Sequence, residues 1–143
     1  MSGDGGFAML MGDLLTPRQY NLPVKVVVFD NSSYGFVVME MKASGFLDFG
    51  TDLVNPNFAK MAEAVGLLGI RAEFPEEIRP ALVQACAHPG PALIDAVVNR
   101  QELSMPPTVT MAQALGFNLY LLKAVINGRG YEIVDLARTN LFR

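Results

Sequence analysis

Short apolar runs alternate along the chain with longer amphipathic stretches. Residues 24–29 and 91–98 are almost continuously apolar, which is typical of strands buried on both faces, and residues 69–74 are predicted to form a further strand. Residues 57–67 and 75–87 are predicted to form helices between and beside these strands. This alternation predicts an α/β fold in three layers, with helices on both faces of a parallel sheet.

The pattern changes toward the C-terminus. Residues 36–56 are predicted to be irregular, because Gly45, Gly50 and Pro56 interrupt them. A proline-containing connector at 101–109 precedes a long apolar helix at 110–127 and a short amphipathic segment at 132–138. We therefore expect a ligand-binding α/β domain over residues 1–100 and a helical C-terminal extension over residues 101–143.

The N-terminus combines glycines with an apolar helix. Glycines at the mouth of a helix allow backbone N–H groups to approach a phosphate, and Gly3-Asp4-Gly5-Gly6 precedes such a run. In a phosphate-binding loop of this kind the glycines follow a strand, but two residues precede Gly3. The domain is therefore expected to be truncated at its N-terminus and to lack its first strand. Thr16, followed by Pro17, is predicted to cap the next helix.

Composition narrows the class of protein. The chain has 143 residues, of which 51% are hydrophobic and 17% charged, so it can fill a core and also cover other domains or subunits. A net charge of -3 gives no reason to expect nucleic-acid binding. There is no signal peptide or membrane-spanning run, and one cysteine, Cys86, permits no internal disulfide. These features predict a cytoplasmic protein.

Two polar segments carry the candidate chemistry. Gly3-Asp4-Gly5 opens the chain, and Asp30-Asn31 closes the strand at 24–29. In an open parallel sheet, ligands bind at the carboxyl ends of the strands, which is where Asp30 and Asn31 are expected. Gly-Asp-Gly alone is also a common turn, so the alternative is two unrelated turns.

Together the two segments resemble the fingerprint of thiamine-diphosphate-dependent enzymes, in which an Asn pair follows a Gly-Asp-Gly. The resemblance implies a Mg²⁺ ion bound by the Asp4 carboxylate, the Asn31 amide oxygen and the Ser33 backbone carbonyl, together with diphosphate oxygens and a water. Such an oxygen set suits Mg²⁺. The residues implied to bind the cofactor are Gly3, Asp4, Gly5, Gly6, Asn31, Ser33, Tyr34 and Gly35.

The chain departs from the fingerprint at Asp30, because the family has Asn at the first position of the pair. We do not expect Asp30 to be a direct metal ligand. Its carboxylate is expected either to bind the metal through water or to cap the turn.

Longer segments resemble one branch of the family, the pyruvate oxidases and pyruvate:quinone dehydrogenases; they are residues 22–46, 57–71, 90–98 and 128–143. The resemblance implies oxidative decarboxylation of pyruvate to acetate and CO2, with electrons passing through FAD to quinone or oxygen. The activating glutamate, the pyrimidine-binding domain and the flavin domain have no counterpart here. The chain is therefore expected to hold no catalytic residue and to be inactive alone. Phe36 is expected either to line the active site or to be an ordinary core residue.

The resemblance extends to the C-terminal tail, residues 129–143. In the quinone-linked branch this segment attaches to the inner face of the cytoplasmic membrane, and its apolar and basic residues suit such a role. The alternative is a tail packed on its own enzyme, which is expected to be a homo-oligomer. The tail favours the quinone branch, but the metal motif does not separate it from acetolactate synthase, a non-oxidative decarboxylase or a stand-alone, non-catalytic binding module.

Overall fold

The structure is a computed structural model that describes residues 1–102 and 108–141, the side chain of residue 141 excepted. It divides into two compact units, Met1–Ser32 with Leu53–Val98 and Ser33–Asp52 with Asn99–Arg143. The chain leaves the first unit after Ser32 and re-enters it at Leu53, whose N–H donates a 3.0 Å hydrogen bond to the Ser32 carbonyl. Ser32 and Leu53, the residues on either side of the excursion, are therefore adjacent in space.

The first unit is built on a parallel sheet with the strand order β1-β2-β4-β3. Its strands are β1 (Ser2–Gly3), β2 (Lys25–Asp30), β3 (Leu68–Ala72) and β4 (Ala92–Val97). The apolar runs predicted to be strands form the two central strands, β2 and β4, which are paired in register from Lys25↔Ala92 to Asp30↔Val97. Strand β1 places Gly3 opposite Phe29, so the residues after Gly3 leave the sheet level with the end of β2.

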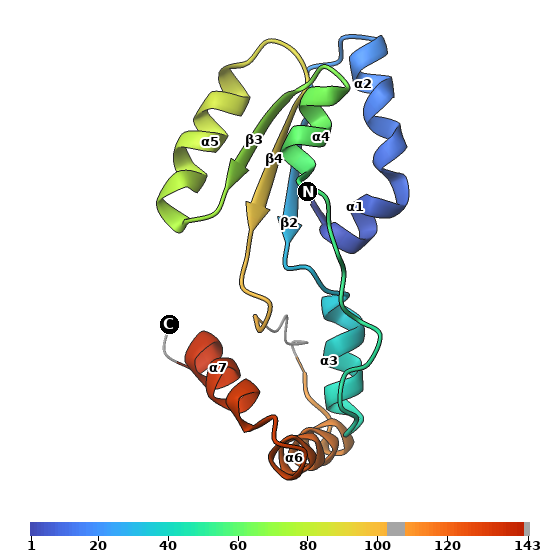
Figure 1. The fold of residues 1–143 in the computed structure, drawn as a ribbon, viewed down its shortest axis with the longest axis vertical. Helices are drawn as coiled ribbons and strands as arrows, with labels where there is room; N and C mark the ends of the chain where they lie inside the picture. The colour runs from blue at the N-terminus through green and yellow to red at the C-terminus, as the bar shows by residue number, and fades with distance from the viewer. Residues whose placement is uncertain (103–107, 142–143) are drawn as a thin grey trace. The chain divides into compact units, whose positions relative to one another are not determined.

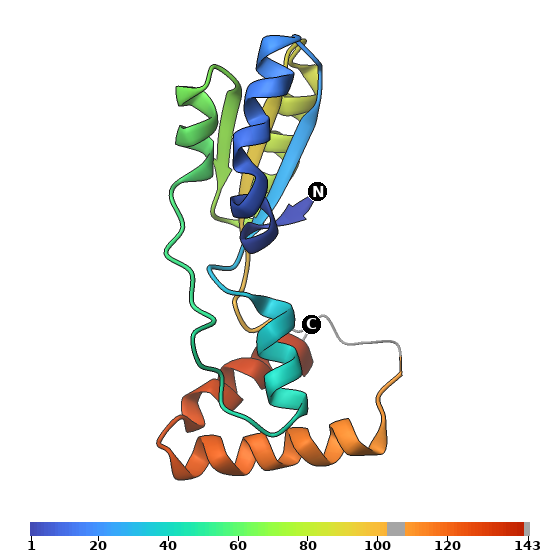
Figure 2. The same ribbon diagram turned by 90° about the vertical axis from the view of Figure 1, so that its right-hand side faces the viewer.

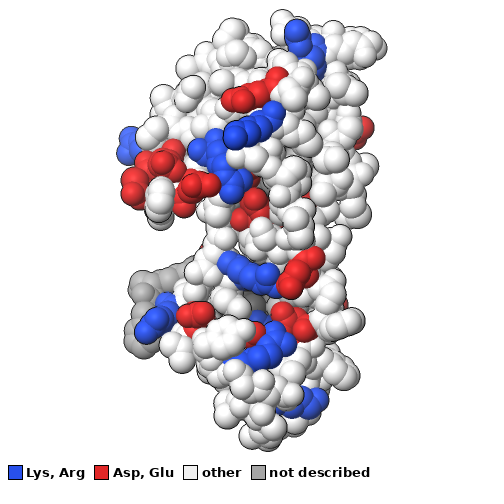
Figure 3. All heavy atoms as spheres, viewed as in Figure 1, with Lys and Arg blue, Asp and Glu red and all other residues white. Residues whose placement is uncertain are grey.

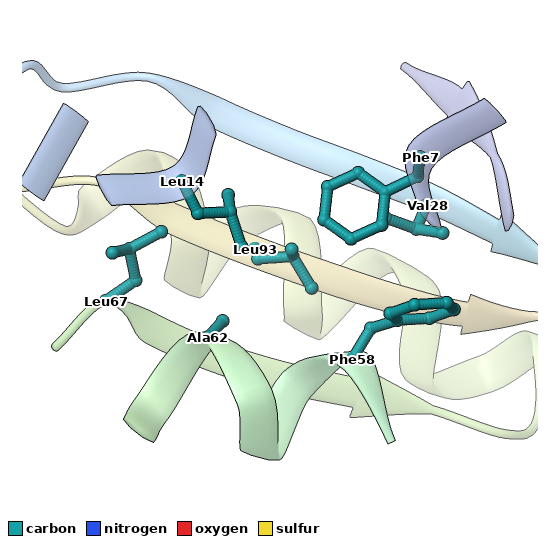
Figure 4. Close-up of a cluster of buried hydrophobic side chains, with 7 residues drawn as sticks. All are labelled: Phe7, Leu14, Val28, Phe58, Ala62, Leu67 and Leu93. Carbon is teal, nitrogen blue, oxygen red and sulfur yellow. The ribbon is translucent and has the colours of Figure 1, made fainter. Parts of the chain in front are cut away.

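Helices cover both faces of this sheet (Figure 1). On one face, α1 (Asp4–Leu10) and α4 (Phe58–Ala64) pack against β2 and β4, and the rings of Phe7 and Phe58 meet edge to face at 5.2 Å (Figure 4). On the other face, α5 (Pro75–Ala87) places Ala81 and Ala85 against alternate residues of β4, such as Ile94. The predicted three-layer α/β fold is confirmed.

The segment after α1 differs from the prediction. A 3₁₀ turn (Met11–Leu14) leads directly into α2 (Leu15–Gln19), so Thr16 lies inside the helix and Leu14 occupies the cap position. The prediction that Thr16 caps this helix is wrong. The cause is the preceding turn, which already supplies helical backbone at Leu14 and leaves no extended residue for a cap.

The second unit consists of α3 (Gly35–Ala43), α6 (Met111–Ile126) and α7 (Gly130–Leu141). Helix α3 overlaps the stretch predicted to be irregular, so that prediction is wrong for residues 36–43. Gly45 ends this helix and does not prevent it from forming. Gly45 has a left-handed φ of 78°, and the Phe46 N–H reaches back to the Met41 carbonyl at 2.9 Å, as in a Schellman motif.

Helices α3 and α6 pack closely (Figure 2). Gly116 of α6 faces the Ala43 carbonyl so tightly that a Cβ at this position would overlap it. Ion pairs and a buried hydrogen bond also stabilise this unit. Arg129 pairs with Asp48 and with Glu132. Tyr120, which is fully buried, donates a 3.3 Å hydrogen bond to the carboxylate of Glu132. Burial, with help from Glu132, raises the pKa of Tyr120 to about 12.

In the part of the chain that the structure describes, no helix has the length and apolar character needed to cross a bilayer. Helix α7 covers most of the predicted membrane-attachment segment. Ile133 and Leu136 of this helix are half-buried within the unit, whereas Val134 and Arg138 are exposed. Residues 142–143 of that prediction lie outside the described residues.

Candidate functional site

The candidate site lies where the first two strands of the first unit end. Asp4 is the first residue of α1, directly after β1, and Asp30 is the last residue of β2. Both carboxylates are buried, with Asp4 2% and Asp30 5% exposed. The Asp4 carboxylate also accepts a 2.9 Å hydrogen bond from the N–H of Gly5. A carboxylate at a helix N-terminus is stabilised by the helix dipole, which explains its tolerance of burial.

Asn55 joins the two carboxylates. Its side-chain nitrogen donates to Asp4 Oδ2 at 2.7 Å and to Asp30 Oδ1 at 2.8 Å. Asn55 was not among the predicted site residues, because it lies in a stretch predicted to be irregular and no spacing links it to residues 51 and 25 positions earlier. An isolated Asn-Pro pair is an ordinary turn signal.

Asp30 caps the turn that follows β2. Its Oδ1 accepts hydrogen bonds from the N–H and the hydroxyl of Ser32, at 3.1 and 3.2 Å. This Asx-type arrangement stabilises Ser32, whose φ of 53° is left-handed and unfavourable for a residue with a side chain. Turn capping was one of the two roles expected for Asp30, and the hydrogen bonds are of that kind.

A charged network continues behind Asp30. Arg71 of β3 lies with its Nη1 3.7 Å from Asp30 Oδ2 and 2.6 Å from Asp95 Oδ2, and its Nε contacts Glu73 at 2.8 Å. The N–H of Phe58 also donates to Asp95, at 3.1 Å. Burial raises the pKa of Asp95, and the Arg71 guanidinium opposes that rise.

The remaining predicted site residues fall in both units. Gly5 and Gly6 lie in the first turn of α1, and Asn31 directly follows β2, so these residues share the carboxyl edge with Asp4. Ser33, Tyr34, Gly35 and Phe36 belong to the second unit.

In the second unit, Ser33 and Tyr34 form hydrogen bonds to Thr51. The Tyr34 N–H and the Ser33 hydroxyl both donate to the Thr51 carbonyl, at 2.9 and 3.2 Å. The Ser33 carbonyl, a predicted ligand, accepts a 2.9 Å hydrogen bond from the Gly35 N–H across a tight turn. Phe36 is 72% exposed, so within this unit it is not a core residue.

The donor chemistry of these residues fits a hard cation. Within the residues that the structure describes, no three His, Cys, Asp or Glu side chains are grouped to hold a metal ion. The predicted set is of another kind, with one carboxylate, one amide oxygen and one backbone carbonyl, which leaves positions for phosphate oxygens, as Mg²⁺ usually requires. Asp4 suits this role because two of its roughly four acceptor positions are used.

Charge on the surface is mixed. On the face shown in Figure 3, several acidic side chains gather in one area at the left, and basic side chains lie beside them. Ion pairs with partly exposed side chains include Arg71 with Glu73 and Arg100 with Asp52.

Known proteins resemble the chain over most of its length. It is 35% identical to the protein YdaP of Bacillus subtilis (strain 168) over 137 residues, which are 96% of this chain and 24% of YdaP. It is 40% identical to the pyruvate oxidase of Lactiplantibacillus plantarum over 101 residues, 68% of this chain and 17% of that enzyme. An acetolactate synthase large subunit of Porphyra purpurea is 33% identical over 81% of this chain and 21% of its own length. The chain thus spans about a quarter or less of these relatives.

Two solved structures are also similar to the chain in fold. The benzoylformate decarboxylase of Polynucleobacter necessarius superposes with a TM-score of 0.66 at 25% identity, over 73% of this chain and 20% of that one. A thiamine diphosphate-dependent 4-hydroxybenzoylformate decarboxylase of Rhodococcus jostii RHA1 gives a TM-score of 0.63 at 28% identity, over 68% of this chain and 19% of that one. Residues 1–96, which include β1 to β4 and the Asp4 site, match the family of the thiamine pyrophosphate enzyme C-terminal TPP binding domain. The chain therefore belongs to the thiamine-diphosphate-dependent enzymes, as their C-terminal cofactor-binding domain.

Proposed function

We propose that this chain binds the diphosphate of thiamine diphosphate through Mg²⁺, as one part of an enzyme that oxidatively decarboxylates pyruvate. The observation that carries the proposal is the placement of Asp4. Its buried carboxylate lies at the mouth of α1, after β1 and level with the end of β2, and it keeps acceptor positions for a cation.

The proposed metal ligands are the Asp4 carboxylate, the Asn31 amide oxygen and the Ser33 carbonyl. The backbone N–H groups beside Gly5 and Gly6 would face the diphosphate, since glycines permit close approach. When bound, thiamine diphosphate supplies the electron sink for the decarboxylation of a 2-oxo acid. The chain's own residues bind and orient that group.

The oxidase assignment is supported by the resemblance of the segments around the site and of the tail. The pyruvate oxidase relative is 40% identical over 101 residues, and the acetolactate synthase of Porphyra purpurea is 33% identical over 122 residues. In this proposal FAD is bound mainly by other parts of a homo-oligomeric enzyme, and it passes electrons to quinone or oxygen. The enzyme would be cytoplasmic and attached to the inner face of the membrane through residues 129–143.

The second candidate is another thiamine-diphosphate enzyme, an acetolactate synthase or a non-oxidative decarboxylase. It is favoured by the matches to an acetolactate synthase and to benzoylformate decarboxylases. A stand-alone binding module without catalysis is the third.

Two measurements test the proposal. Titration calorimetry of the chain with thiamine diphosphate should show binding that requires Mg²⁺ and that Asp4→Ala abolishes; retained binding in this variant would refute the metal assignment. The native polypeptide, isolated from its source, should reduce a quinone-like dye only when pyruvate is added. Acetolactate formation, or CO2 release without dye reduction, would favour the second candidate, and no turnover would favour the third.

A further inference from the structure

Asn55 contacts the predicted metal ligand Asp4 but has no role in the proposed chemistry. Its side-chain amide has two N–H hydrogens, and the nitrogen lies within hydrogen-bonding distance of one carboxylate oxygen of Asp4 and one of Asp30. The reverse orientation of the amide would place its oxygen against both carboxylates. Because ionised carboxylates only accept hydrogen bonds, the chemistry fixes the orientation of Asn55.

Asp30 is the better-anchored partner of this amide. Its Oδ1 accepts from Asn55, from the Ser32 N–H and from the Ser32 hydroxyl, and its Oδ2 faces Arg71 at 3.7 Å. Three donors use the lone pairs of one oxygen, and a guanidinium lies beside the other. At 3.7 Å the guanidinium does not use the lone pairs of Oδ2, but its positive charge opposes the approach of a metal ion to Asp30.

Asp4 is in the opposite position. Each of its oxygens accepts one hydrogen bond, from Gly5 or from Asn55, so each keeps a lone pair. The two hydrogen bonds also hold the carboxylate in one orientation. Partners of this kind behind a metal ligand orient it and raise the affinity for the metal.

We propose that Asn55 is a positioning residue for Asp4, with Asp30 as its anchor, and that Asp30 is not itself a ligand of the cation. This inference rests on the proposed function of Asp4.

The test measures the Mg²⁺ concentration that half-saturates thiamine diphosphate binding to the whole chain, by titration calorimetry. Asn55→Ala should raise this concentration about 10-fold or more, the usual effect of losing a partner behind a metal ligand. Asp30→Asn should change it by less than about threefold, because the amide oxygen of Asn still accepts from Asn55. Asp30→Ala should resemble Asn55→Ala.

Asn57→Ala is the matched control. Asn57 lies two positions from Asn55 and caps α4 by accepting from the Lys60 N–H at 2.8 Å, without contacting either carboxylate. This variant should lower the melting temperature and leave the Mg²⁺ requirement unchanged. An unchanged requirement in Asn55→Ala would overturn the proposal, and so would an Asp30→Asn variant as defective as Asp4→Ala, since Asp30 would then be a ligand.

A ligand-free measurement separates this proposal from the proposed function. In NMR spectra of the unliganded chain, both side-chain N–H hydrogens of Asn55 should exchange slowly with water, and Asp30→Ala should release one of them. If the chain binds no thiamine diphosphate but shows this protection, the function of the site fails and the positioning contact stands. Exchange as fast as that of a free amide would overturn the contact itself.

Discussion

The guanidinium of Arg71 lies 2.6 Å from the carboxylate of Asp95, a residue with no exposure to solvent. The two side chains come from adjacent strands and face each other in register. Asp95 Oδ1 has no hydrogen-bond partner among the residues that the structure describes. The pair thus joins a fully buried acid to a cation that is 28% exposed and that also approaches Asp30.

Arg71→Met should destabilise the first unit. The variant leaves the Asp95 carboxylate buried without its cation, which costs about 3 kcal/mol in comparable pairs. Urea unfolding at neutral pH measures the loss. Arg79→Met, an exposed arginine on α5, is the control and should change the free energy of unfolding by less than about 0.5 kcal/mol. Equal effects of the two substitutions would contradict the proposed importance of the pair.

Asp95 should also make stability depend on pH. Burial raises its pKa above the ordinary value of 3.8, so the folded chain holds this proton more tightly than the unfolded chain. The contribution of Asp95 to the free energy of unfolding therefore falls as pH rises from 3.8 through the raised pKa. Asp95→Asn should flatten the stability curve in this window, as measured by urea unfolding at a series of pH values. A curve of unchanged slope would show that other groups determine it.

Gly116→Ala should separate α3 from α6. The added Cβ would overlap the Ala43 carbonyl, which is backbone and cannot rotate away. Overpacking of this kind costs about 1–3 kcal/mol, visible as a lower melting temperature. Gly130→Ala is the control, because a Cβ there meets nothing within 4 Å. A neutral Gly116→Ala would mean that the two helices do not approach as closely as described.

The proposed membrane attachment predicts that the chain floats with vesicles containing anionic lipid. Val134 lies on α7 and is 49% exposed, so Val134→Asp should weaken flotation by replacing an exposed apolar side chain of the helix with a charged one. Val83→Asp changes an exposed valine of α5 and should have no effect. Equal flotation of both variants and the parent chain would contradict attachment through the tail.

The sequence predicted the sheet well because its buried strands carry strong local signals. Lys25–Asp30 and Ala92–Val97 are apolar and β-branched, and Pro75–Ala87 carries a proline start and acidic first turn, so each element was predicted within one or two residues. Helix α3 was missed because Gly45, which lies in the turn that ends it, was taken as a sign of irregular chain.

The site was less accessible to prediction. Asp4 and Asp30 follow strands, so the topology of a parallel sheet brings them to one edge, and sequence alone could indicate this. Asn55 reaches that edge through tertiary packing, with no spacing or motif that marks it. Arg71 lies near the end of β3, but no motif marks its side chain as part of the site. Their contribution became visible only from side-chain contacts.

The hydrogen bond between the Leu53 N–H and the Ser32 carbonyl has a consequence for how this domain tolerates change. The intervening residues 33–52 leave and return at a single point, in the manner of an inserted segment. The sheet and its helices are therefore complete without that segment, and a linker of a few residues would close the chain. Insertions and deletions within 33–52 can therefore alter the second unit while the sheet of the first unit keeps its fold.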